Sequence, residues 1–286
     1  MSTSLKGVWQ FGITYEYNSL NSVYAGASKL NDDTRERLTQ SIIIETNYGI
    51  TNSFRLTALF SFVNQTRSID PIYGISNELS SRGFGDALIM LKYNLISLNI
   101  LDNRELAFGA GLKVPLGKSE ITSGEILLPA DMQPGTGSWD GVFWAYYSEK
   151  LFVELPLNIF INASYKINST NERFGINRGG YKFGNEFISS IGFGYRTDTF
   201  IDFTLFARFR NTNPDEFGDQ DISNTGGNWL YLVPGINFKI YQTLTARLSS
   251  QLPLYRELKG TQLTTTFTTA LSLFISIGGL SNPLRL

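Results

Sequence analysis

The sequence contains no cysteine and no histidine. Without cysteine, neither a disulfide framework nor a thiolate metal site can form. Without histidine, the chain lacks the most common metal ligand and the most common general base of enzymes. We therefore expect no metal site and no cofactor, and the composition indicates no catalytic residue.

Charged residues and long apolar runs are also scarce. Charged residues make up 17% of the chain, against about 25% in ordinary soluble domains. The net charge of −1 gives no sign of the clustered basic surface that a nucleic-acid partner requires. No apolar run approaches the roughly 18 to 20 residues of a membrane-spanning helix. Residues 1–6 hold no apolar stretch of signal-peptide type, so we expect an exported protein to be present here in its mature form.

What the sequence has in excess is aromatic residues, 14% of the chain, placed in segments where apolar and polar residues alternate. In residues 104–114, Leu106, Phe108 and Leu112 alternate with Gly109 and Gly111. Successive residues of a strand point to opposite faces, so this strand has one apolar face and one small or charged face. About twelve segments of roughly ten to fourteen residues share the pattern, and no helical periodicity competes with it.

The connections between these segments alternate in length. Short turns at 49–53 and 196–198 contrast with long polar loops at 19–35, 65–82, 118–134, 169–181 and 211–228, and the hairpin at 257–261 is an exception. This arrangement is typical of outer-membrane barrels, in which strands of about nine to eleven tilted residues cross the hydrocarbon. Lipid permits only closed sheets, because an open edge leaves backbone groups unpaired. The sequence predicts an all-β fold in which residues 1–286 form a single transmembrane antiparallel up-and-down β-barrel of about twelve strands.

A soluble barrel or double sandwich, with the apolar faces turned inward, is the competing interpretation. Two features count against it. Segments of about twelve residues are long for soluble sheets, whose strands usually have about five to six. The face opposite the apolar one is also rich in Gly, Ser and Thr, where a soluble surface carries more Lys and Glu.

Three short motifs follow one another in the middle of the chain: Gly83 to Asp86 (GFGD), Gly109 to Gly117 (ending in LKVPLG) and Gly135 to Asp140 (GTGSWD). This ordered set resembles the outer-membrane family named for the meta-pathway of phenol degradation. The resemblance covers residues 83–147; beyond them only the general barrel pattern remains. It implies a bacterial outer-membrane transporter or channel, and it supplies no binding residues to transfer.

Enzymatic alternatives find little support. Outer-membrane phospholipases, omptin proteases and lipid A deacylases rely on histidine, which this chain lacks. A serine–lysine system stays formally open, but no spacing indicates one. Several loop aspartates could collect calcium or simply be solvated, and they lack EF-hand spacing. These are Asp70, Asp131, Asp215, Asp219 and Asp221.

The alternation predicts a barrel lumen lined by charges of both signs: Glu16, Glu45, Arg55, Asp86, Lys92, Lys113, Glu186, Asp202, Arg208, Arg210, Lys239 and Arg247. Eight strands leave room only for side chains, and sixteen to eighteen leave a channel, so about twelve strands is intermediate. Two interpretations stay open: a conducting or substrate-selective lumen, or ion pairs that fill and brace a narrow barrel. Arg208 and Arg210, near a strand end, are candidates for an anion-attracting mouth or for solvated rim charge.

Aromatic residues near the segment ends predict interfacial girdles, with sugar stacking as the other use: Trp9, Tyr15, Tyr17, Tyr48, Tyr93, Trp139, Tyr165 and Tyr195. Gly109 and Gly111 face the predicted lumen. There they would widen it or let the 118–134 loop pack inside.

The leading hypothesis is a channel or transporter of the bacterial outer membrane for small solutes, including apolar or aromatic ones. Its partners would be outer-membrane lipid and an unknown small molecule. The alternative is a non-conducting barrel that serves as a structural or interaction subunit of an envelope complex, binding a protein partner through its long loops.

Overall fold

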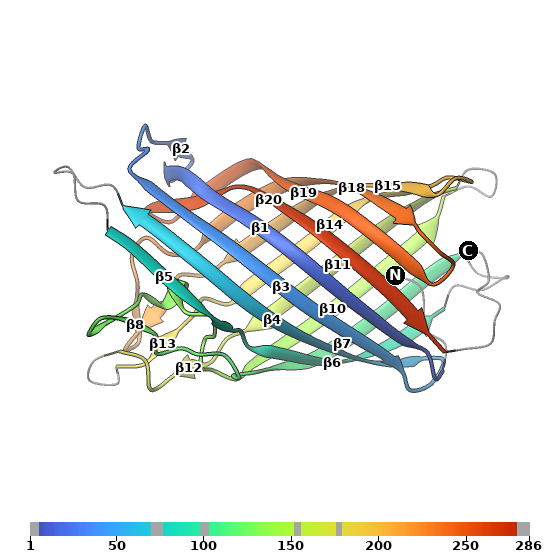
Figure 1. Ribbon diagram of the computed structural model, residues 1–286, viewed down its shortest axis with the longest axis horizontal. Coiled ribbons are helices and arrows are strands. Elements are labelled where there is room, and N and C mark those ends of the chain that lie inside the picture. Colours follow the sequence, from blue (N-terminus) through green and yellow to red (C-terminus); the bar gives the residue numbers. More distant parts are fainter. Residues whose placement is uncertain (1–5, 70–76, 98–102, 152–155, 176–178, 279–286) are drawn as a thin grey trace.

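The computed structural model describes residues 6–69, 77–97, 103–151, 156–175 and 179–278. The strands form a closed antiparallel β-barrel (Figure 1). Its wall has twelve strands, and the barrel closes because β1 pairs with both β3 and β20. The predicted fold is therefore confirmed. The wall consists of β1 (Trp9–Ala25), β3 (Arg35–Gly49), β4 (Phe54–Ile69), β5 (Asn77–Phe84) continued by β6 (Ala87–Ile96), β7 (Arg104–Val114), β10 (Asp140–Lys150), β11 (Leu157–Ile167), β14 (Glu186–Arg196), β15 (Ile201–Thr212), β18 (Gly227–Lys239), β19 (Leu244–Leu258) and β20 (Thr261–Ile277).

Large apolar side chains cover the outside of the wall. Ile44 in β3 is 50% exposed and Leu271 in β20 is 52% exposed, and exposed residues of this kind recur on the other strands. A soluble protein buries such residues, so a continuous exposed apolar belt marks a surface that faces hydrocarbon. The competing soluble barrel with inward apolar faces is thereby excluded.

Aromatic rings, most of them exposed, gather where β1, β3, β4 and β6 meet the short turns. Trp9 lies 4.6 Å from Tyr48 between ring centroids, and Phe54 lies 4.9 Å from Tyr93. All four belong to strand ends on the side of the short 50–53 turn. Rings at this height fit an interfacial girdle, in which the amphipathic side chain sits at the headgroup level. No helix in the described ranges has the length and apolar character needed to cross a membrane.

Several strands are longer than the alternation predicts. Parts of the predicted 19–35 and 65–82 loops are strand, because β1 runs to Ala25 and β4 runs to Ile69. The end of β1 is held by pairing with β20, where Ala25 lies opposite Thr261. These extensions carry polar residues on both faces, so the sequence there lacks the alternation that signals a half-buried strand.

One wall strand is broken by a bulge between β5 and β6. Residues 85–87 lie between the Phe62–Phe84 pair and the Leu59–Leu88 pair, opposite only two residues of β4. A β-bulge of this kind bends a strand and redirects a side chain. The neighbouring strand, β7, ends at Val114 opposite Ala87, and β5 pairs with β4 alone among the described strands.

The long connections lie at one end of the barrel, where Figure 1 places β8, β12 and β13. β12 (Thr170–Asn171), β13 (Tyr181–Lys182), β16 (Glu216–Phe217) and β17 (Gln220–Asp221) form a small sheet from two of these connections. A third connection, residues 115–139, contains β8 (Thr122–Ser123), β9 (Ile126–Leu127) and the short helix η1 (Ala130–Met132). We call residues 115–139 the constriction loop.

Candidate functional site: a lumen narrowed by an inserted loop

The predicted lumen residues lie on the inner face of the wall. Those within strands alternate with outward-facing residues. They are distributed as Glu16 in β1, Glu45 in β3, Arg55 in β4, Asp86 in the bulge, Lys92 in β6, Lys113 in β7, Glu186 in β14, Asp202, Arg208 and Arg210 in β15, Lys239 in β18 and Arg247 in β19. They do not form a single cluster. The structure places eight of them in bracing ion pairs, in a joint that holds the constriction loop, or in a column of arginines. The other four lie elsewhere on the inner face: Glu16, Glu45, Arg55 and Lys92.

Three ion pairs brace neighbouring strands. Arg210 Nε lies 2.6 Å from Glu186 Oε2, and Lys166 Nζ lies 3.4 Å from the other carboxylate oxygen of Glu186. Asp202 Oδ1 lies 2.7 Å from Lys239 Nζ at the short-turn end. These acids and bases satisfy one another, so this part of the lumen matches the interpretation in which ion pairs brace the barrel.

A buried polar joint, formed by Asp86, Lys113, Thr136 and Asp140, holds both ends of the constriction loop; we call it the latch. The Lys113 ammonium lies 3.1 Å from Asp86 and forms a second ion pair with Asp140. It also donates a hydrogen bond to Thr136 Oγ1, and Thr136 N and Oγ1 donate to Asp86 Oδ2 at 2.8 and 2.7 Å. The Asp140 side chain is 0% exposed and that of Asp86 is 6% exposed.

The latch explains why the three sequence motifs occur together. The bulge in the first motif carries Asp86, the second supplies Lys113, and the third supplies Thr136 and Asp140. Gly117 donates its backbone N–H to Asp86 Oδ1 at 3.0 Å. A Cβ on Gly117 or Gly135 would lie 2.6 Å from the backbone of the other residue, so only glycine permits this contact.

This contact yields a test of the loop joint. Gly135→Ala is expected to lower the free energy of unfolding by about 1 to 3 kcal/mol, because an added methyl group in a tight contact forces the backbone apart. The matched control is Gly141→Ala, since a Cβ on Gly141 meets nothing within 4 Å. Urea unfolding in detergent micelles, followed by tryptophan fluorescence, measures the difference. Equal stability of the two variants would contradict the close packing of the loop limbs.

The constriction loop lies inside the mouth of the barrel. Met132 is 0% exposed and Leu128 is 2% exposed. Asp131 Oδ2 lies 2.7 Å from Arg37 of β3 and 3.7 Å from Arg67 of β4, two arginines on the inner face. The 118–134 loop therefore packs inside, but not at the predicted place, because residues of β6 and β10 such as Met90 and Trp144 lie against Gly109 and Gly111.

The loop aspartates do not gather as a calcium site. Asp131 is an ion-paired anchor, and Asp215 accepts hydrogen bonds from the Tyr181 hydroxyl and the Gly184 N–H. Asp70 lies outside the described residues. Within the described ranges no group of three or more candidate acidic ligands occurs. Burial, and then the bond to Asp215, raise the pKa of Tyr181 far above its usual value, so this hydroxyl stays protonated and holds two long connections together.

A column of arginines occupies the inner face of β15 and β19, with β18 between them. Arg210 stacks over Trp229 at 5.0 Å, Arg208 over Phe206 at 5.4 Å, and Arg256 over Tyr24 at 4.5 Å. Arg247 lies nearer the short-turn end. We call Arg256, Arg210, Arg208 and Arg247 the arginine column. Arg210 is close to the strand end, as predicted, but it is ion-paired with Glu186 and is not a free rim charge.

The constriction loop and the arginine column stand on opposite sides of the lumen. In the ring of wall strands, β15 and β18 lie half a turn from β4 and β6, against which the loop packs. Where the constriction loop lies inside the barrel, any path through the lumen therefore runs between this loop and the arginine column.

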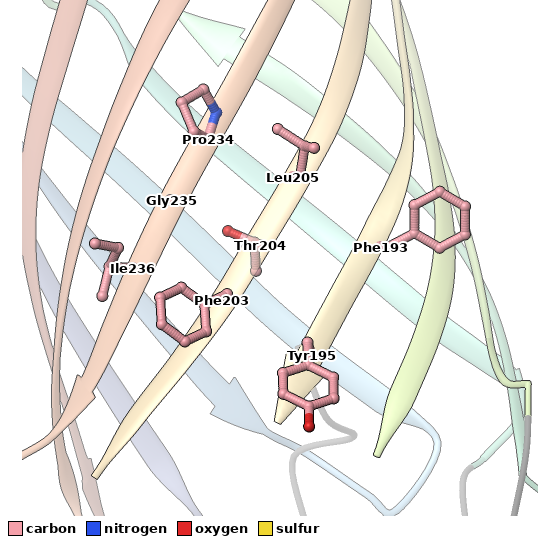
Figure 2. A pocket seen from close by; sticks show the side chains of 8 residues that line it. All are labelled: Phe193, Tyr195, Phe203, Thr204, Leu205, Pro234, Gly235 and Ile236. Carbon is pink, nitrogen blue, oxygen red and sulfur yellow. The ribbon is translucent and has the colours of Figure 1, made fainter. Parts of the chain in front are cut away.

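An apolar groove on the barrel is not part of this path. Figure 2 shows its lining, which comes from β14, β15 and β18 and includes Phe193, Phe203 and Leu205. Its volume is about 400 Å³. The rings that line it are exposed on the outer face, so the groove faces hydrocarbon.

Comparisons with known proteins bear on the fold. No family model matches the sequence, and no curated protein matches it. The chain is similar to an outer membrane channel from Pseudomonas putida F1, with a TM-score of 0.75 and 15% identity over 96% of this chain and 97% of that chain. It is also similar to the β domain of the Bordetella autotransporter BrkA (TM-score 0.54, 9% identity, 95% and 100% coverage). A third similar structure is the transport unit of the autotransporter AIDA-I from Escherichia coli (TM-score 0.51, 11% identity, over 95% of this chain and 90% of that chain). The chain has the fold of a bacterial outer-membrane β-barrel.

Several residues of the site were missed by sequence reasoning. Arg37, Arg67 and Arg256 face inward, and Asp140 completes the latch. Arg256 follows a register shift in the pairing of β18 with β19, which interrupts the alternation. Arg67 lies near the end of β4, beyond the apolar belt. Asp140 carried one signal, its place in the third motif, but nothing in the sequence indicates that it pairs with Lys113.

Proposed function

We propose that this protein is a channel of the bacterial outer membrane for small solutes, with its pathway between the constriction loop and the arginine column. The carrying observation is that charged inner side chains, among them Glu16, Lys92 and Arg208, keep accessible surface although a closed wall surrounds them. A lumen filled by its own ion pairs would leave such groups buried. Accessible charge inside a closed wall instead favours a water-filled space.

The size and lining of this space favour small solutes with an apolar part. The inserted loop narrows a barrel that already has an intermediate number of strands. On the facing wall, the partly buried ring of Phe160 packs against a buried cluster of Phe206, Trp229 and Tyr231. Aromatic rings of this kind bind flat apolar groups by stacking. The likeness to a protein described as an outer membrane channel supports transport, without indicating which solute.

The proposal predicts discrete conductance. Purified protein inserted in a planar lipid bilayer should give single-channel steps in potassium chloride, because ions share the water-filled path with solutes. Heat-modifiable migration on a denaturing gel checks that the barrel is folded. A folded barrel that inserts without conductance or solute flux would contradict the channel.

A second function, as an interaction subunit, is favoured by one observation. The β12-β13-β16-β17 sheet projects from the long-loop end, and Tyr181–Asp215 and Lys182–Glu216 contacts hold it in shape. A fixed sheet at this end could bind another envelope protein by strand addition. Co-purification of a stoichiometric partner together with absence of conductance would support this function over transport.

A further inference from the structure

We propose that the lumen selects anions, and that the arginine column binds small organic carboxylates that carry an apolar part. The inference rests on the proposed channel function and deepens it.

Three members of the column lack an ion pair. In the described part of the chain, no carboxylate oxygen lies within 4.0 Å of Arg208, Arg247 or Arg256. Their hydrogen bonds go to neutral acceptors: Arg208 to Gln251 Oε1 at 2.8 Å, Arg247 to Thr204 Oγ1 at 3.4 Å, and Arg256 to the Thr265 carbonyl. The Nε atom of each is buried without a hydrogen-bond partner. A guanidinium has five N–H donors, so each retains unfilled donor capacity.

The acids of the same wall do not neutralise these arginines. Glu186 and Asp202 are paired with Arg210 and Lys239. Glu16 acts on Arg208 through its charge but forms no ion pair with it. The wall formed by β15, β18 and β19 therefore carries an excess of positive charge. Pores lined by arginine or lysine select anions, and low-dielectric walls focus such a field.

The positions of the arginines suit stepwise passage. Arg247 and Arg256 are separated along β19 by about 30 Å, at about 3.3 Å per residue. Arg208 lies between them, since its neighbour Tyr231 pairs with Pro253 and its hydrogen-bond partner is Gln251. Several sites of moderate strength allow an ion to enter and also to leave.

The chemistry of the column favours carboxylates with an apolar part over inorganic anions. A guanidinium presents parallel N–H donors that match a carboxylate with two hydrogen bonds. Phe206 lies under Arg208, and its ring packs edge-on against Phe160 at 5.7 Å. An aromatic carboxylate would thus place its charge on Arg208 and its ring against Phe160, which is only partly buried.

Ion selectivity tests the first half of the proposal. In bilayers with a potassium chloride gradient, the wild-type reversal potential should show chloride permeability several-fold above that of potassium. Arg208→Gln/Arg247→Gln should keep conducting but lose most of this preference. Lys259→Gln, which removes a positive charge from an exposed turn, is the matched control and should leave selectivity unchanged.

Block by organic acids tests the second half. Benzoate should reduce chloride current at a concentration several-fold below that needed for acetate, and neutral benzyl alcohol should have little effect. Arg208→Lys keeps the charge but loses the planar pair of donors, so it should retain chloride selectivity and require several-fold more benzoate.

The outcomes separate the two proposals. A conducting but cation-selective or unselective wild type, or a double variant with unchanged selectivity, would overturn anion selection. Equal block by benzoate and benzyl alcohol, or by benzoate and acetate, would overturn carboxylate binding. No conductance at all would overturn the channel itself.

Discussion

Lys113→Met is expected to lower the free energy of unfolding by about 3 to 5 kcal/mol and to loosen the constriction loop. Removing one partner of a buried ion pair leaves an uncompensated charge, which is why the expected loss is large. Here two carboxylates, Asp86 and Asp140, share one ammonium, and both are almost completely buried. Without Lys113 they would repel each other at the point where both ends of the loop are fixed. Urea unfolding in micelles measures the stability.

The controls for Lys113→Met separate charge from packing. Lys118→Met removes a lysine from the same loop at an exposed position, and its effect should stay within about 0.5 kcal/mol. The neutral triple variant Asp86→Asn/Lys113→Met/Asp140→Asn should recover part of the lost stability, because no buried charge remains unpaired. If Lys113→Met were as stable as Lys118→Met, the latch would not hold the loop.

The membrane-spanning part of the fold could be predicted from the sequence because lipid imposes a simple rule. Residues such as Ile44 and Leu271 must face hydrocarbon, and their inward neighbours need not, so the alternation is strong. Beyond the apolar belt both faces of a strand meet water. The alternation of apolar and polar residues is then lost, so the sequence predicts loops where β1 and β4 in fact continue as strands.

The site could be predicted only in part. The alternation places Lys113 and Asp86 on the inner face, but their pairing depends on the bulge at residues 85–87 and on the return of the loop. Asp131 illustrates the limit: a loop acid can be solvated, bind a cation or meet an arginine, and only the folded loop brings it to Arg37. Long-range contacts of this kind leave no periodic signal in the sequence.

Replacing residues 120–132 by a short Gly-Ser linker is expected to raise single-channel conductance several-fold and to admit larger solutes. The linker can bridge the gap because Gly135 N donates to the Lys118 carbonyl at 2.9 Å, so the two limbs are already adjacent. The replacement keeps the latch and removes the buried Leu128 and Met132 from the mouth.

Liposome swelling with sugars of increasing size measures the wider path, alongside conductance in planar bilayers. Asp131→Asn gives an intermediate case, since the loop stays in place but loses its ion pairs with Arg37 and Arg67. Its channels should therefore fluctuate between the wild-type level and a larger one. A folded linker variant with wild-type conductance would show that the loop lies outside the path, and the narrowest point would then have to be sought among the arginines of β15 and β19.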